Sequence, residues 1–187
     1  MYGIKAVSFV LFLLVAPALG QLPGVSAFVG YSYMSADLAP TRTNLNGWNG
    51  SVEGKVLPFI GLVADLSGYY GSPTFPAVVC PTGLLPPCPQ LTANVREYNF
   101  LFGPRFSFSI RKFRPFAHGL LGAGHISESF VGFSPSDTKF AYAVGGGIDY
   151  HLIPRISWRV QADDLRTRFF GNTKYNFRLS TGIVVHF

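Results

Sequence analysis

The end of the chain constrains the fold most strongly, because residues 175–187 alternate between apolar and polar side chains and stop on an aromatic residue. A period of two places successive side chains on opposite faces of a β-strand. One face carries Tyr175, Phe177, Leu179, Thr181, Ile183, Val185 and Phe187, and the other carries Asn176, Arg178, Ser180, Gly182, Val184 and His186. An apolar strand that ends a protein in this way is typical of the closing strand of a membrane β-barrel.

Charged side chains are scarce in this sequence. Hydrophobic residues make up 48% of the chain, aromatic residues 16% and charged residues 13%, whereas an average soluble domain has about 25% charged residues. Outside the amino terminus, no run approaches the roughly 18 apolar residues that a membrane helix needs. If this chain lies in a bilayer, it therefore crosses the bilayer as strands.

The amino terminus has the pattern of a secretory signal peptide. A lysine precedes a short apolar core at residues 6–16, and Ala18 and Gly20 stand at the small-residue positions of a cleavage site. As a helix, that core would span about 16 Å, which is too short for a hydrocarbon layer about 30 Å thick. We therefore expect residues 1–20 to be a signal peptide and residues 21–187 to form one exported domain, with an uncleaved anchor as the alternative.

The two cysteines agree with export. Cys80 and Cys88 lie in the proline-rich sequence CPTGLLPPC, and a disulfide between them would close a short loop in an oxidising compartment. Two free thiols are the alternative. Two sulfurs without a nearby histidine make at most half of a zinc site, so we expect no metal there.

Turn signals divide residues 26–187 into eight segments, most of which alternate. The segments that we expect to be strands are 26–37, 48–57, 61–71, 95–109, 115–127, 139–151, 156–169 and 175–187. Longer loops, beginning with a polar one at 38–47 and a proline-rich one at 72–94, follow the odd-numbered segments, and tight turns follow the even-numbered ones. We therefore predict an all-β fold, an eight-stranded antiparallel up-and-down transmembrane β-barrel.

Alternation also assigns the two faces of each strand. Phenylalanine and tyrosine dominate one face, for example Phe100 and Phe102 in segment 95–109, and lipid is the natural partner of such a face. The other face then points into a barrel whose interior has room only for side chains. Because an unpaired buried charge costs several kcal/mol, we expect charges of both signs to pair there and to plug the interior. The predicted interior charges are Glu53, Lys55, Asp65, Glu97, Arg105, Asp149, Arg159, Asp163 and Arg178.

The chain resembles the small eight-stranded outer-membrane β-barrel proteins of Gram-negative bacteria, which include the OmpA membrane domain and OmpX. The segments that carry the resemblance are Gly103-Pro104-Arg105, Gly145-Gly146-Gly147-Ile148-Asp149-Tyr150, Arg159-Val160-Gln161-Ala162-Asp163 and the terminal Phe187. The resemblance implies an outer-membrane location and insertion by the barrel assembly machinery, for which Phe187 would be the recognition signal. No peptidoglycan-binding domain follows the barrel, so a tether to the cell wall is not supported.

Catalytic chemistry has one candidate in the sequence. His125 and Ser127 stand two residues apart and are similar to the His-x-Ser pair of outer-membrane lipid A deacylases. A hydrolase needs a third group that orients the base, and Glu128 would face the opposite side of the strand. His118, His151 and His186 are isolated and lack metal-ligand spacing, so hydrogen bonding inside the barrel is their expected role. We therefore expect neither an enzyme nor a bound metal or cofactor.

Basic residues gather at two predicted connections. The net charge is +6, but no basic cluster is interleaved with exposed aromatics, so nucleic acid is not an expected partner. Bases at 111, 112 and 114 form either a solvated turn or a contact with lipid phosphates. Arg166, Arg168 and Lys174 flank the last loop and could contact lipopolysaccharide phosphates.

The sequence as a whole favours a non-enzymatic integral outer-membrane protein. Its expected partners are outer-membrane lipids, lipopolysaccharide and, during biogenesis, the barrel assembly machinery. The outer loops would serve surface contact or adhesion, and a narrow porin-like channel is the first alternative. A secreted lipocalin-like barrel is the alternative from another class, and it would place the apolar faces inside.

Overall fold

The computed structural model describes residues 24–38, 41–72, 74–75, 91–92, 94–129, 136–169 and 172–187. Strands account for nearly all of them, and none of the described residues forms a helix of the length and hydropathy that a bilayer crossing requires. The strands are β1 (Val25–Leu38), β2 (Thr41–Leu57), β3 (Ile60–Gly71), β4 (Thr74–Phe75), β5 (Leu91–Thr92), β6 (Asn94–Ser107), β7 (Phe113–Ser129), β8 (Ser136–Ile153), β9 (Ile156–Phe169) and β10 (Asn172–His186).

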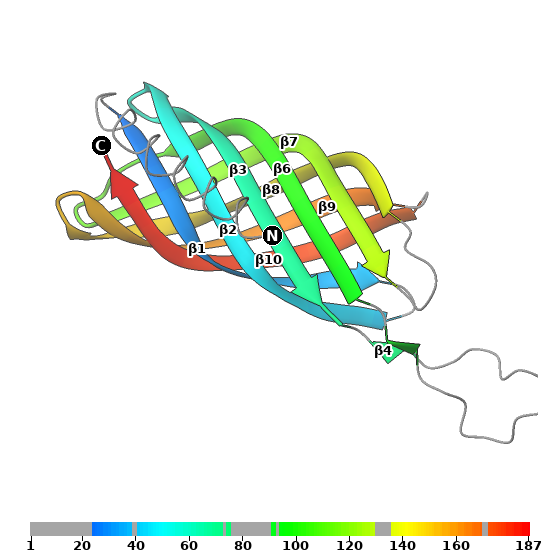
Figure 1. The fold of residues 1–187 in the computed structure, drawn as a ribbon. Helices are drawn as coiled ribbons and strands as arrows, with labels where there is room; N and C mark the ends of the chain where they lie inside the picture. The colour runs from blue at the N-terminus through cyan, green and yellow to red at the C-terminus, as the bar shows by residue number, and fades with distance from the viewer. Residues whose placement is uncertain are drawn as a thin grey trace, which may run out of the picture.

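Eight of these strands form a closed antiparallel barrel (Figure 1). Each strand pairs with its neighbours in chain order, and the first and last barrel strands close the ring, with Ser26 opposite His186 and Ser35 opposite Phe177. Closure leaves no strand edge unpaired, which is the condition for β-structure in hydrocarbon. The prediction of an eight-stranded up-and-down barrel is confirmed.

The connections gather in two groups at opposite ends of the barrel. The turns after β2, β6 and β8 lie at the same end as the carboxy terminus, which we call the turn end (Figure 1). The connections after β1, β3, β7 and β9 lie at the other end, the loop end, where β4 and β5 form a small separate ladder. The connection between β3 and β6, the longest in the chain, lies at the loop end, as the sequence suggested.

Most loops at the loop end are shorter than predicted. The expected polar loop at 38–47 is wrong, because β2 begins at Thr41 and residues 41–47 continue the ladder with β1. Similarly, β8 begins at Ser136 and β10 at Asn172, before the predicted starts. Only the segment between β3 and β6 keeps a long connection. The physical reason is that these strand ends are polar outside and apolar inside, the reverse of the rest of the barrel.

Outward side chains form an apolar belt around most of the barrel. Phe100 is 58% exposed and Trp158 and Phe177 are each 46% exposed, whereas Arg159 and Asp163 are 1% exposed. This orientation is the reverse of the lipocalin-like alternative, and a face so apolar suits hydrocarbon rather than water. Members of the apolar belt include Val29, Val52, Leu62, Leu66, Phe100, Phe102, Phe106, Leu121, Val144, Ile148, Trp158, Phe177, Leu179 and Ile183.

Tyrosines separate the apolar belt from a polar rim at the loop end. On β6, the outward residues change from Phe100 to Tyr98 and then to Arg96 and Asn94. Aromatic residues with a polar tip are enriched where hydrocarbon meets water. The belt therefore ends at this level, and the strands continue beyond it. We define the polar rim as the outward residues Arg42, Asn44, Asn46, Asn94, Arg96, His125, Thr138, Asp164 and Arg166.

Hydrogen bonds and ring contacts join the tyrosines to the polar rim. Tyr33 donates to Asn44 Oδ1 at 2.7 Å on the neighbouring strand, and Tyr31 donates to Asn46 Oδ1. The Arg166 guanidinium lies 5.0 Å from the centre of the Tyr175 ring, a cation–π distance. These contacts satisfy the phenol groups at the edge of the apolar belt.

Candidate functional site

Inward side chains build an ion network that crosses the barrel, and its first part lies nearest the turn end. Glu53 on β2 accepts from Arg114 Nη2 at 2.7 Å and from Arg105 Nη1 at 3.2 Å. Arg114 also donates to Ser107 Oγ from Nε and Nη2. All three charged groups are buried, so the carboxylate between two guanidinium groups supplies the compensation that buried charge requires.

His118 on β7 links this part of the network to the next. Arg105 Nη2 lies 3.3 Å from His118 Nδ1, and His118 Nε2 lies 2.7 Å from Asp163 Oδ1. A guanidinium can only donate, so Nδ1 acts as the acceptor and the ring proton resides on Nε2, which donates to the carboxylate. The geometry thus fits the neutral Nε2–H tautomer, placed between a cation and an anion.

Arg178 on β10 occupies the centre of the second part. Its Nε donates to Asp163 Oδ2 and its Nη1 donates to Asp65 Oδ1, each at 2.7 Å. Asn49 Nδ2 adds a hydrogen bond to Asp65 Oδ2 at 2.9 Å. Short charge-assisted bonds of this kind are about twice as strong as neutral ones. Together they tie β2, β3, β9 and β10 across the interior.

A separate ion pair joins Asp149 on β8 to Arg159 on β9. Arg159 Nε and Nη2 donate to the two carboxylate oxygens at 2.6 and 2.8 Å, a bidentate arrangement. The Phe116 ring lies 4.6 Å from the Arg159 guanidinium and 4.3 Å from that of Arg105. One ring thus contacts two like-charged groups by cation–π interaction, which favours keeping both cations in a confined space.

Seven of the nine predicted interior charges form ion pairs with described residues, and two do not. Lys55 lies near the turn end, where its Nζ donates to Pro58 O at 3.0 Å and to Ser107 Oγ at 3.3 Å. Glu97 is 1% exposed and accepts from Asn99 Nδ2 at 3.1 Å, with no ion pair among the described residues. The network also includes Arg114, which the sequence analysis assigned to a turn. Its inward position follows from the register of β7 with β8, which pairs Arg114 with Asp149.

The interior becomes apolar toward the loop end. On β2 the inward residues change from Glu53 to Asn49 and then to Leu45, and on β9 they change from Asp163 to Leu165. We call this buried cluster the apolar plug, which alternation along single strands did not predict. Its members are Met34, Ala36, Leu45, Val63, Tyr69, Val95, Leu101, Leu120, Ile126, Ala141, Ala143 and Leu165.

The other predicted sites lie apart from the interior. His125 lies on the outward face of β7 and its Nδ1 contacts Thr138 Oγ1 at 2.7 Å, while Ser127 lies on the same outward face. Phe187 ends the outward face of β10 and is 37% exposed. Within the described parts of the chain, no group of three or more potential metal ligands is present.

Several sequence predictions fall outside the described residues. They are the signal peptide at 1–20, the cysteines Cys80 and Cys88, and the side chains of Glu128 and Arg168. These remain predictions. Lys174 is partly exposed near the loop end, on the strand next to Arg166.

Known proteins share this fold at low sequence identity. No family model and no curated protein matches the chain. The structure is similar to Neisserial surface protein A, with 12% identity, a TM-score of 0.67, and coverage of 88% of this chain and 97% of that one. It is also similar to Ail, the attachment invasion locus protein of Yersinia pestis, solved with the heparin analogue sucrose octasulfate. The identity to Ail is 19%, the TM-score is 0.58, and 87% of this chain and 99% of that one are covered.

A protease is also among the similar structures. The outer membrane protease OmpT from Escherichia coli matches with 11% identity and a TM-score of 0.51, covering 87% of this chain and 96% of that one. The fold by itself therefore supports both catalytic and non-catalytic barrels. What the matches share is the architecture: this chain has the fold of the small outer-membrane β-barrels.

Proposed function

We propose that this protein is a non-enzymatic integral outer-membrane protein with a closed interior and a loop end that serves contact with other molecules or surfaces. The observation that carries the proposal is the change of character at the tyrosine level on β1, β2 and β9. On the turn-end side of that level, the outward residues of these strands are mainly apolar and the inward ones mainly polar or charged, and on the loop-end side the outward residues are polar and the inward ones mainly apolar. Such a barrel suits a bilayer in one part and water in the other.

The two interior layers support the absence of a solute path. The ion network occupies the interior next to the apolar belt, and its arginines are among the largest fully buried side chains. Most of the apolar plug lies on the loop-end side of the network, so an ion would meet first paired charges and then mainly apolar side chains. The narrow-channel alternative lacks a comparable supporting feature in the described residues.

The extension beyond the tyrosine level supports a role in surface contact. It raises the polar rim and the long connection between β3 and β6 away from the apolar belt. Ail, one of the similar structures, is the attachment invasion locus protein of Yersinia pestis and was solved in complex with a heparin analogue. By analogy, we propose adhesion or ligand contact at the loop end, with the identity of the ligand open.

Cysteine labelling tests both the location and the orientation. In a background without the native cysteines, Asn94→Cys probes the polar rim, Arg155→Cys probes the turn end and Phe102→Cys probes the apolar belt. In intact cells treated with a membrane-impermeant maleimide, only the rim variant should be labelled. Disruption of the outer membrane should add the turn-end variant, because its side chain is exposed at the opposite mouth.

The outcomes of the labelling experiment separate the alternatives. Labelling of Arg155→Cys but not Asn94→Cys in intact cells would show the opposite orientation and would contradict a surface role for the loop end. Recovery of the protein in the soluble fraction, with Phe102→Cys reactive without detergent, would contradict the membrane location itself.

A further inference from the structure

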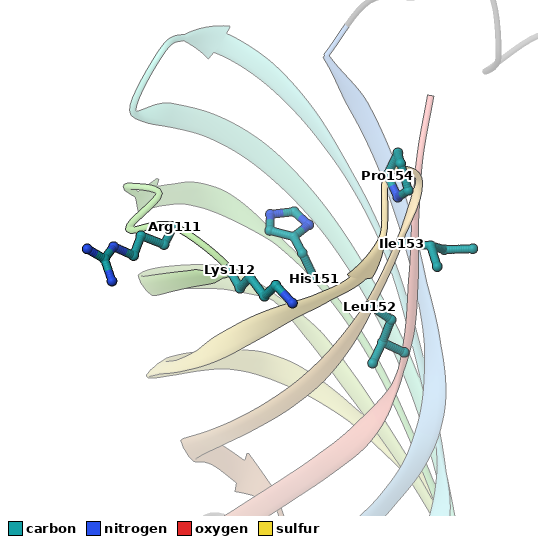
Figure 2. Close-up of a pocket in the computed structure, with 6 residues that line it drawn as sticks. All are labelled: Arg111, Lys112, His151, Leu152, Ile153 and Pro154. Atoms are coloured by element: carbon teal, nitrogen blue, oxygen red, sulfur yellow. The ribbon is translucent and has the colours of Figure 1, made fainter.

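The turn end carries an open pocket of about 320 Å³ between two neighbouring turns (Figure 2). The turn between β6 and β7 contributes two bases, and the end of β8 with its turn contributes the remaining residues. The lining residues are Arg111, Lys112, His151, Leu152, Ile153 and Pro154. The two turns are joined by a backbone hydrogen bond from His151 N to Lys112 O at 2.8 Å, so the walls of the pocket are held in a defined relation.

The lining combines positive charge with exposed apolar surface. Arg111 and Lys112 are exposed, and no carboxylate is among the six lining residues. Leu152 is 52% exposed and Ile153 is 56% exposed, and they stand where the apolar belt reaches the turn end. A ligand that matches both halves is an anion with hydrocarbon attached to it.

Arg111 occupies a backbone conformation that ordinarily belongs to glycine. Its φ is 54°, and it is the only residue other than glycine with a positive φ among those described. Ile110 and Phe113 pair across the turn, with Ile110 N donating to Phe113 O at 2.7 Å, so Arg111 is the first of two central residues. Tight hairpins usually place glycine at such positions. The backbone at the rim of the pocket therefore adopts a conformation that disfavours any side chain, and strain of this kind clusters at binding sites. The exposed Arg111 side chain points away from His151 (Figure 2), so it would have to turn toward a ligand in the pocket.

His151 is oriented by a hydrogen-bonded pair behind it. Its Nδ1 lies 2.8 Å from Ser157 Oγ, and the same oxygen lies 2.8 Å from His186 Nε2. This use of Nδ1 leaves Nε2 as the ring nitrogen that can bind a ligand in the pocket. When Ser157 Oγ–H donates to His151 Nδ1, the ring proton lies on Nε2, and the imidazole then provides a third donor that is positioned by β9 and β10.

We propose that this pocket binds the phosphate group of a phospholipid from the leaflet at the turn end. Arg111, Lys112 and His151 Nε2 would bind the phosphate oxygens, and the acyl chains would follow Leu152 and Ile153 onto the apolar belt. A free inorganic anion would leave the apolar half of the pocket without a partner, which is why the lipid is the favoured source of the phosphate. The proposal rests on the proposed membrane location.

Native mass spectrometry of the full chain in detergent tests the proposal. The probes are dioleoyl phosphatidylglycerol, dioleoylglycerol, which has the same chains without the phosphate, and inorganic phosphate. The test variant combines Arg111→Asn with Lys112→Gln, since asparagine tolerates the left-handed conformation. Arg155→Gln is the matched control, because it removes an exposed base from the neighbouring turn but not from the pocket lining.

The expected result is preferential binding of phosphatidylglycerol that depends on the two bases. Each base should contribute roughly fivefold to the affinity, so the double variant should bind roughly 25-fold more weakly and the control nearly as tightly as the wild type. Equal binding of dioleoylglycerol would overturn phosphate recognition. If inorganic phosphate bound as tightly as the lipid, the lipid would not be the favoured source of the phosphate. If Arg155→Gln lost as much affinity for the lipid as the double variant, the two bases would act by general electrostatic attraction and not through the pocket.

Separate control experiments check the folding of the variants and the membrane location of the protein. All variants should keep the heat-dependent gel mobility shift of a folded barrel, so that weaker binding is not confused with unfolding. If cysteine labelling supports the membrane location but phosphatidylglycerol binding is absent, the headgroup site alone is wrong. If the protein is recovered in the soluble fraction, the proposed function fails first.

Discussion

Asp163 and Glu97 are both buried carboxylates inside the same barrel, but their surroundings differ. Asp163 contacts the side chains of Arg178 and His118 at 2.7 Å, whereas the hydrogen bond described for Glu97 comes from the neutral amide of Asn99. The stabilisation that a buried charge provides depends on whether a partner compensates its loss of hydration. These two residues therefore should respond differently to the same chemical change.

At the residue scale, we predict that Asp163→Asn and Glu97→Gln have unequal effects. The first removes a charge that two partners compensate, so the free energy of unfolding should fall by about 3 kcal/mol. The second keeps shape and hydrogen-bonding capacity while removing a charge that has no ion-pair partner among the described residues, so it should change stability by less than about 1 kcal/mol or increase it. Denaturant unfolding in lipid vesicles measures both, and equal losses would contradict the described network.

At the element scale, one strand passes through two environments. The outward residues of β1 run from Val25 through Val29 to the tyrosines and then to Ser35 and Asp37. Its inward residues change in the opposite sense, from Ser26 and Ser32 to Met34. Apolar and polar side chains alternate along all of β1, so its pairing with the neighbouring strands continues without interruption. What changes is the face that carries the apolar residues, which is the outward face near the turn end and the inward face near the loop end.

This exchange predicts that one substitution has position-dependent effects on β1. Val29→Arg places a cation in the middle of the apolar belt and should destabilise the barrel by about 2–4 kcal/mol, whereas Ser35→Arg lies beyond the tyrosines and should cost about 0–1 kcal/mol. The free energy of unfolding in vesicles of one lipid composition is the measurement. Similar losses at both positions would place the edge of the belt elsewhere.

At the scale of the whole molecule, closure of eight strands creates an interior that two different layers fill. The ion network links six barrel strands through side chains, and the separate Asp149–Arg159 pair adds β8. The apolar plug packs residues from β1, β2, β3, β6, β7, β8 and β9. An eight-stranded barrel has an interior only wide enough for side chains. Either layer alone should therefore block the passage of ions.

Planar-bilayer recording tests the two-layer barrier. The wild type should show no single-channel steps, and neither should Leu101→Ala with Leu165→Ala, which trims the plug, nor Glu53→Ala with Arg105→Ala, which removes both partners of an ion pair. The combination of all four substitutions should conduct, provided that the heat-dependent gel shift shows a folded barrel. Steps from the wild type would contradict the closed interior, and steps from either double variant would show that one layer alone forms the barrier.

The class of fold and the face on which each side chain lies could be predicted from the amino-acid sequence. A period of two is a local property of a strand, so the alternation around Trp158 and Phe177 predicted outward aromatics and inward charges without knowledge of the partners. Tight turns were equally local, because Pro154 and its neighbours interrupt an alternating pattern. Residues 41–47 are the exception, because their polarity predicted a loop and their inward Leu45 was the only sign of a strand.

The pairing of the charges, and the level at which the barrel extends beyond the apolar belt, depend on the folded barrel. Arg178 reaches Asp65 across 113 positions of sequence, and such a contact depends on closure and register, which no local pattern contains. Glu97 gives a second example. Alternation predicted that it faces inward, but the residues beside it come from other strands, and none of those described is a basic partner. Local periodicity orients side chains, whereas the assembled sheet selects their neighbours.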